Sequence, residues 1–220
     1  MASFPVPDEK LSARRGHQRG TALIEFVFAF GLLFVPLFLG IIAIGLSLVR
    51  ANQVTEVCRD AGHMYAYGVD MSQTASQTLV AAELAQGLGM TTTGGTGVIY
   101  LSTITYIDAL ACTTNGLPGD AANCPNINQM VVVKRITIGN SSVQSSGFAT
   151  PAASIITSTG NISSANYLTN SSCRAPNFSN VIPMTVSGQY AYVSEMFIHS
   201  PDAALWTLFQ SSMISARSVF

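Results

Sequence analysis

The stretch RGTALIEFVFAFGLLFVPLFLGIIAIGLSLV, residues 19–49, decides the fold of this 220-residue chain. Within it, residues 26–46 carry no charged or strongly polar side chain, and this length is enough for a helix to cross a bilayer. Pro36 lies inside the run and removes one backbone donor, which membrane helices tolerate. Glu25 stands at its start, although an ionised carboxylate costs about 2.5–3.5 kcal/mol at the centre of a membrane helix. The sequence therefore predicts a membrane span preceded by a carboxylate that needs an explanation.

Positive charge is concentrated before the apolar run, at Lys10, Arg14, Arg15 and Arg19. Because lysine and arginine are enriched on the cytoplasmic side of a span, this asymmetry places the N-terminus in the cytoplasm and the chain after residue 50 outside. A cleaved secretory signal is the competing interpretation, but its apolar core has about 7–15 residues and is shorter than this run. The sequence thus predicts a single-pass membrane protein whose C-terminal domain faces outward. In a bacterium this means an inner-membrane protein with its C-terminal domain in the periplasm.

Composition argues against several classes of function. Charged residues make up 10% of the chain and the net charge is −1, so no basic surface is indicated that would attract nucleic acid. No G-x-S-x-G, HExxH or CxxC motif occurs, and the glycine-rich segment MTTTGGTG, residues 90–97, lacks the lysine of a phosphate-binding loop. We therefore expect no enzymatic activity, no metal, no cofactor and no nucleic-acid partner.

Four cysteines follow the apolar run, and four cysteines allow three disulfide connectivities. Cys112 and Cys124 bracket the turn-rich loop TTNGLPGDAAN, which a disulfide could close in an oxidising compartment. We expect these two to pair, which leaves Cys58 and Cys173 as the remaining pair. Four buried thiols are the alternative.

The helix that begins in the span is expected to continue to about residue 68, because apolar residues follow the span at helical spacing. They are Val54, Val57, Cys58, Ala61, Met64 and Tyr65. Gly68 and Asp70 mark its expected end. A second helix is expected over residues 72–88, closed by Gly87 and Gly89.

Two later segments, residues 98–107 and 129–140, are rich in β-branched and aromatic residues and predict an antiparallel hairpin. Lys134 and Arg135 interrupt the second segment, so we expect them to point outward or to lie on a sheet edge.

Three further elements are expected towards the end of the chain. Residues 184–198 predict a third strand with a bulge at Gly188, and residues 153–157 a short strand within a polar loop. Ser200 as N-cap and Pro201 as first helical residue predict a final helix. Its apolar stripe would contain Leu205, Leu208, Phe209 and Met213. This helix would pack on the sheet or the first helix, or alternatively touch a membrane or partner.

Together these patterns predict an α+β protein with three regions. Residues 1–20 form a basic cytoplasmic leader, and residues 21–68 form the membrane-spanning helix and its extension. Residues 69–220 form a small exported domain with an antiparallel sheet.

The segment RGTALIEF, residues 19–26, resembles the cleavage motif of type IV-like pilins, and best fits the TadE-like pseudopilins of tight-adherence (Flp-type) pilus systems. Gly20 ends a basic leader, Glu25 follows five residues later, and Phe26 opens the span. The resemblance extends over about residues 20–68. It implies that a prepilin peptidase cuts after Gly20, so that the mature chain begins at Thr21, and that Glu25 meets the new amino terminus of a neighbouring subunit.

The resemblance also implies the partners: the membrane, the prepilin peptidase, other pilin or pseudopilin subunits, and inner-membrane pilus assembly proteins. A minor filament subunit and a membrane scaffold both fit the sequence. Two other interpretations remain open. One is a plain signal anchor whose Glu25 reaches the membrane interface. The other is a membrane-anchored exported binding or adhesion domain unrelated to pili.

Overall fold

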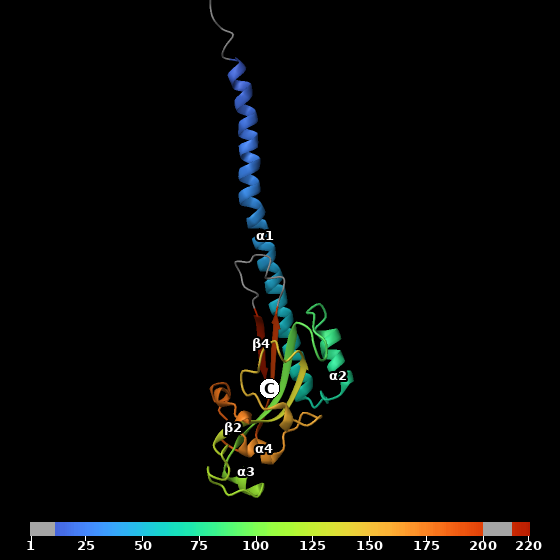
Figure 1. Cartoon of the computed structure of the whole chain (residues 1–220), viewed down its shortest axis with the longest axis vertical. Helices are drawn as coiled ribbons and strands as arrows, with labels where there is room; N and C mark the ends of the chain where they lie inside the picture. Colours follow the sequence, from blue (N-terminus) through green and yellow to red (C-terminus); the bar gives the residue numbers. More distant parts are fainter. Residues whose placement is uncertain (1–11, 200–212) are drawn as a thin grey trace, which may run out of the picture. The chain divides into compact units, whose positions relative to one another are not determined.

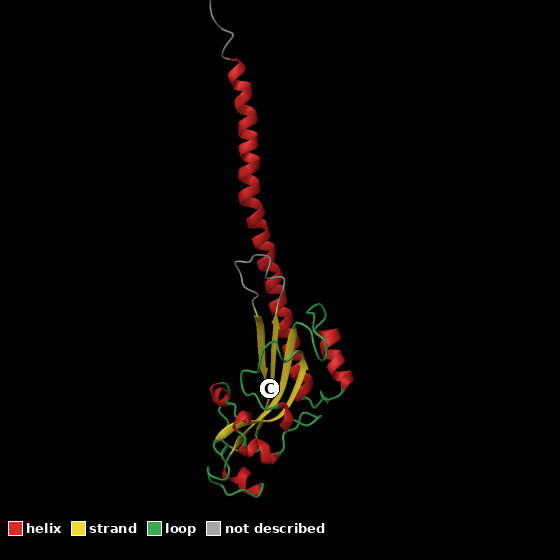
Figure 2. Ribbon diagram, in the orientation of Figure 1, coloured by secondary structure: helices red, strands yellow, loops and turns green. Residues whose placement is uncertain are grey.

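The computed structural model of the protein describes residues 12–199 and 213–220, and the chain divides into two compact units, Met1–Leu46 and Ser47–Phe220. Helix α1, Ser12–Ala66, contributes to both units and continues through Pro36 (Figure 1). The second unit contains a four-stranded antiparallel sheet with short helices and loops (Figure 2). The predicted α+β class, with a long apolar N-terminal helix and an antiparallel sheet, is confirmed.

Helix α1 ends close to the predicted position because a glycine closes it. Gly68 has a φ of 87°, in the left-handed region that glycine adopts at little cost. The Gly68 N–H donates to the Tyr65 carbonyl at 3.1 Å, and the Val69 N–H donates to the Met64 carbonyl at 3.0 Å. These two bonds form a Schellman motif, which satisfies carbonyls that the end of a helix would leave unpaired.

The second helical segment is shorter than the predicted helix over 72–88. It consists of α2, Thr74–Thr78, and a π-helical turn η1, Leu79–Leu84. Asp70 accounts for the late start, because its carboxylate accepts hydrogen bonds from both the backbone N–H and the hydroxyl of Ser72, and so holds a turn ahead of the helix.

The sheet has the strand order β2-β1-β3-β4, and every neighbouring pair is antiparallel. Its strands are β1, Gly97–Ile107, β2, Gln129–Gly139, β3, Tyr190–His199, and β4, Met213–Val219. The hairpin predicted from residues 98–107 and 129–140 is confirmed as the β1–β2 pair.

The bulge lies elsewhere than the sequence predicted. Gly188 precedes β3 in a turn, with a φ of 84°, so the strand expected over 184–198 begins only at Tyr190. The register instead shifts between Thr103 and Ile104 on β1, which leaves Val133 of β2 without a cross-strand partner there.

Two other expected elements differ in the structure. The short strand expected over 153–157 is instead a 3₁₀ turn, Ala153–Ile155, followed by a single β-bridge between Ile156 and Ile162. Met213, placed in the apolar stripe of the final helix, begins β4 and pairs with His199. The rest of that predicted helix, residues 200–212, lies outside the described residues.

Each face of the sheet packs against a different part of the chain. The apolar stripe of α1 packs on one face, as its helical spacing predicted, and Figure 1 shows the helix running along the strands. The other face is covered by loops and by α3, Ala109–Thr114, α4, Ser164–Thr169, and the 3₁₀ turns η3, Ser171–Cys173, and η4, Pro176–Asn180. The domain therefore has a core on each side of one sheet.

Gly62 lets α1 approach the sheet closely. A Cβ atom at this position would overlap the Phe220 ring and lie 3.0 Å from the Ser194 Cβ. Gly62→Leu is therefore expected to lower the free energy of unfolding of the domain by about 1–3 kcal/mol, the usual cost of overpacking. Thermal unfolding of the full chain in detergent measures this change. Gly45→Leu is the matched control, because a Cβ at Gly45 meets nothing within 4 Å. Equal midpoints for the two variants would contradict the close approach.

Candidate functional site

Between residues 23 and 49, α1 carries exposed apolar side chains on every face of the helix. The segment Gly20–Ala66 contains a window with a mean hydropathy of 2.8, and none of that window is buried inside the structure. Its large apolar side chains between residues 23 and 49 are each 41–83% exposed. A helix that is apolar on every face needs an apolar environment around it. This part of α1 is compatible with a single-pass membrane anchor.

The four residues of the proposed processing motif all lie in α1 and are exposed: Gly20, Thr21, Glu25 and Phe26. Thr21 and Glu25 are four residues apart, so they share one face of the helix. No hydrogen bond or ion pair joins Glu25 to another residue within the described part of the chain. The carboxylate is therefore presented on the helix surface, one turn from the residue that would become the amino terminus.

Nothing in the described structure requires a glycine at position 20. A Cβ atom built there meets no atom within 4 Å, and the residue lies within regular helix. Glycine costs about 1 kcal/mol relative to alanine in a helix. Gly20 therefore weakens the helix at the Gly20–Thr21 bond without improving packing.

A column of phenylalanine rings follows the motif, and sequence reasoning missed it. The ring centres of Phe26 and Phe30 are 5.9 Å apart, and those of Phe30 and Phe34 are 4.7 Å apart. The signal was the i, i+4, i+8 spacing of the three residues, which places them on one helix face. All three rings are about half exposed or more, so the column is available to lipid or to another helix.

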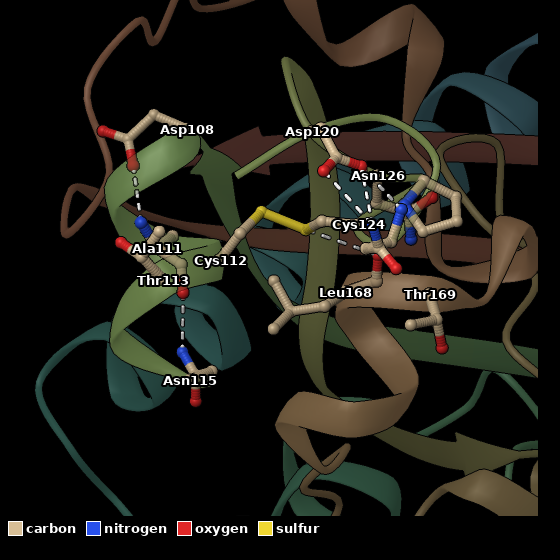
Figure 3. Close-up of a disulfide and its surroundings, with 12 residues drawn as sticks. Asp108, Ala111, Cys112, Thr113, Asn115, Asp120, Cys124, Asn126, Leu168 and Thr169 are labelled. Carbon is tan, nitrogen blue, oxygen red and sulfur yellow. Dashed lines mark hydrogen bonds between the residues drawn. A yellow bond between two sulfur atoms is a disulfide. The ribbon is translucent and has the colours of Figure 1, made fainter. Parts of the chain in front are cut away.

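The structure joins Cys112 to Cys124 in a disulfide that closes the turn-rich loop (Figure 3). Hydrogen bonds to Asp108 and Asp120 stabilise the backbone near the two ends of this loop. The Asp108 carboxylate accepts from the Ala111 N–H at 2.8 Å, and caps α3. The Asp120 carboxylate accepts from backbone N–H groups of the turn before Cys124.

The expected pairing of Cys58 with Cys173 is wrong: both are free, buried thiols. Cys58 belongs to the core beneath α1, whereas Cys173 belongs to the core on the opposite side of the sheet. The sheet separates them. Burial raises the pKa of both thiols above its usual value.

An ionic cluster around a buried glutamate lies on the sheet face away from α1, and no sequence motif indicated it. Glu195 on β3 is fully buried, and its carboxylate accepts hydrogen bonds from the Gly147 N–H at 3.1 Å and from the Ser146 hydroxyl. The Arg217 Nε on β4 lies 3.0 Å from the Glu195 Oε1. The cluster therefore ties the loop around residue 147 to two strands of the sheet.

Arg135 belongs to the same face, with its side chain buried. The sequence predicted that it would point outward or lie on an edge; β2 is an edge strand, but the guanidinium is directed inward. Its Nε donates to the Ser102 hydroxyl at 3.1 Å and its Nη1 to the Ala149 carbonyl at 2.6 Å. Burial lowers the pKa of this guanidinium, and the negative charge of Glu195 opposes that shift.

Within residues 12–199 and 213–220, no group of three or more histidine, cysteine, aspartate or glutamate side chains could hold a metal ion.

Comparison with known proteins gives a match at the N-terminal helix. The family described as TadE-like protein matches residues 20–63, and the match begins at Gly20 itself. No curated protein and no solved structure matches the chain. The matched residues cover the processing motif, the apolar segment and most of the stripe that packs on the sheet. The predicted resemblance is thus confirmed: over residues 20–63 this chain is similar to TadE-like proteins.

Proposed function

We propose that this protein is a pseudopilin-like component of a tight-adherence pilus assembly system, and that a prepilin peptidase processes it after Gly20. The family match at residues 20–63 carries the proposal, because it suggests involvement in such a system and begins at the proposed cleavage site. The role is structural rather than enzymatic: α1 joins the protein to the membrane and to other pilin or pseudopilin subunits.

Glu25 has a specific part in this proposal. Cleavage after Gly20 creates a positively charged amino group at Thr21, on the helix face that carries Glu25. In lipid, either charge alone is costly, and pairing relieves the cost of both. Glu25 can pair with the amino terminus of its own chain or with that of an adjacent subunit. The second arrangement would set the axial position of one helix against the next.

We place the leader in the cytoplasm and the domain after residue 50 in the periplasm, because of the excess of lysine and arginine before the span. A reporter enzyme that is active only after export, fused after residue 70, is expected to be active. A second reporter that is active only in the cytoplasm, fused at the same site, is expected to be inactive. The reverse result would contradict both the orientation and the pilus role.

Deletion of this protein in its own host tests the proposed function. The expected result is loss of surface pili in electron micrographs. Expression of the wild-type chain should restore the pili, whereas expression of a chain that lacks the membrane-spanning segment should not. If pili remain in normal number while attachment to surfaces falls, the protein is instead a membrane-anchored adhesion domain. Genomic neighbours encoding a prepilin peptidase and a secretion ATPase would agree with the first outcome.

A further inference from the structure

A groove of about 520 Å³ opens on the sheet face that α1 covers only in part. Helix α1 ends at Ala66, whereas the strands continue beyond it, and their side chains form the groove floor. Thr103 lies directly across from Tyr192, and Thr105 from Tyr190, so two hydroxyl–aromatic rows cross from β1 to β3. The groove lies wholly within the unit Ser47–Phe220.

Tyrosine is the most frequent residue type in the groove lining, and most of the tyrosine hydroxyl groups are available. Four tyrosines line it, of which Tyr65 is buried and shares a hydrogen bond of 2.6 Å with the Thr103 hydroxyl. Burial raises the pKa of Tyr65 to about 12. Within the described residues, no hydrogen bond engages the hydroxyls of Tyr167, Tyr190 or Tyr192. Tyr190 is 57% exposed. The groove thus offers aromatic surface together with three unengaged phenols.

The charges that line the groove balance. Lys134 is its cation and Asp70 its anion. The Lys134 Nζ lies 5.9 Å from the centre of the Tyr65 ring, and the Asp70 carboxylate already accepts hydrogen bonds from Ser72 and Gln73. A polyphosphate or a nucleic acid needs several cations along its path. The groove therefore fits a ligand that is neutral and rich in hydroxyl groups.

The sheet edge beside the groove cannot accept an added peptide strand. The Val133 carbonyl already accepts from the Ile162 N–H at 2.9 Å, and the Arg135 N–H already donates to the Gly160 carbonyl at 2.7 Å. Strand addition needs free main-chain groups at an edge. A ligand must therefore be held by side chains on the face of the sheet.

We propose that this groove binds a neutral saccharide, with pyranose rings packed against Tyr190 and Tyr192. One face of a pyranose presents C–H groups, which carry the positive partial charge that the face of an aromatic ring attracts. The hydroxyl groups of the pyranose bond to the free phenols, to Asn161 and to Lys134, which all line the groove. Aromatic and aliphatic side chains together with a few polar groups are the usual lining of a small-molecule site. This activity belongs to the exported domain and does not depend on processing after Gly20.

Isothermal titration calorimetry on the full chain in lipid nanodiscs tests the proposal. The probes are the neutral oligosaccharides maltopentaose, cellopentaose and penta-N-acetylchitopentaose, with pentagalacturonate as the acidic comparison. At least one neutral probe is expected to bind with a millimolar or lower Kd. Tyr190→Ala is expected to weaken that binding at least about tenfold, whereas Tyr190→Phe, which keeps the ring, should retain most of it.

Tyr67→Ala is the matched control, because Tyr67 is 84% exposed and does not line the groove. It should bind as the wild type does, and thermal midpoints should show that both alanine variants are folded. Three outcomes would overturn the proposal: no binding of any neutral probe at millimolar concentration, binding that Tyr190→Ala leaves unchanged, or binding of pentagalacturonate alone.

Discussion

Gly20→Leu is expected to leave residues 1–20 attached to the membrane-extracted protein, whereas the wild type begins at Thr21. The reason is steric. The proposed peptidase must hold the backbone around the Gly20–Thr21 bond in an extended form, and a leucine adds bulk beside that bond and strengthens the helix that must unwind. Intact-mass measurement distinguishes a chain that is twenty residues longer, in a host that carries the matching peptidase.

Gly31→Leu is the matched control for this experiment. Gly31 also lies in α1, and a Cβ atom there likewise meets nothing within 4 Å. The control should be cleaved as the wild type is, because the substitution is far from the bond. A wild-type mass that still includes residues 1–20 would remove the processing proposal altogether, and normal cleavage of Gly20→Leu would show that the glycine has another role.

Glu25→Ala is expected to impair incorporation into pili, whereas Gly20→Leu is expected to impair the earlier cleavage step. It leaves the scissile bond intact, so the mass should still show a chain that begins at Thr21. Incorporation into pili, measured in sheared filament fractions, should fall, because the new amino group then lies near lipid without its carboxylate partner. Glu25→Gln keeps the size of the side chain and loses its charge, so incorporation of this variant into pili should fall by a similar amount. If Glu25 were only an interfacial residue of a signal anchor, neither substitution would alter incorporation.

Glu195→Leu is expected to lower the free energy of unfolding of the domain by about 1–3 kcal/mol, the usual cost of leaving buried hydrogen-bond donors without their acceptor. The Arg217 side chain is 49% exposed, so water can solvate its charge after the substitution. Glu195 is fully buried and is bonded to Arg217 and to the Gly147 N–H. Its loss leaves the guanidinium of Arg135 buried without the nearby negative charge. Within the described structure the Nη2 of Arg135 already has no hydrogen-bond partner, so no existing contact replaces that charge.

Chemical denaturation of the full chain in detergent, followed by circular dichroism, measures this loss. Glu195→Gln separates the effect of charge from that of shape, because an amide can keep part of the hydrogen bonding and none of the ionic interaction. This variant should also be less stable than the wild type, but more stable than the leucine variant. Glu56→Gln is the control, because Glu56 is exposed on α1 and should change stability by less than about 0.5 kcal/mol. A Glu195→Gln variant as stable as the wild type would contradict an energetic role for the buried charge.

The sequence alone determined the elements whose signals are local. The apolar run and its length predicted the N-terminal helix, and residues 19–26 with the basic leader and the span indicated the resemblance to TadE-like proteins, because such local features need no tertiary contact. The end of α1 near Gly68 was also predictable, since a left-handed residue just beyond the last helical residue closes the helix through bonds to its last turn. Residue type likewise predicted the β1–β2 hairpin.

Only the tertiary structure decided the features that depend on residues far apart in the chain. The sheet lies between Cys58 and Cys173, so these two thiols, which the sequence alone would allow to pair, stay free. Met213 pairs across from His199 in a strand, where local periodicity predicted a helix. The ionic cluster around Glu195 and the tyrosine groove both draw on several strands, and register sets which side chains meet. Strand order and register arise from pairing and packing of the whole domain, which no local pattern encodes.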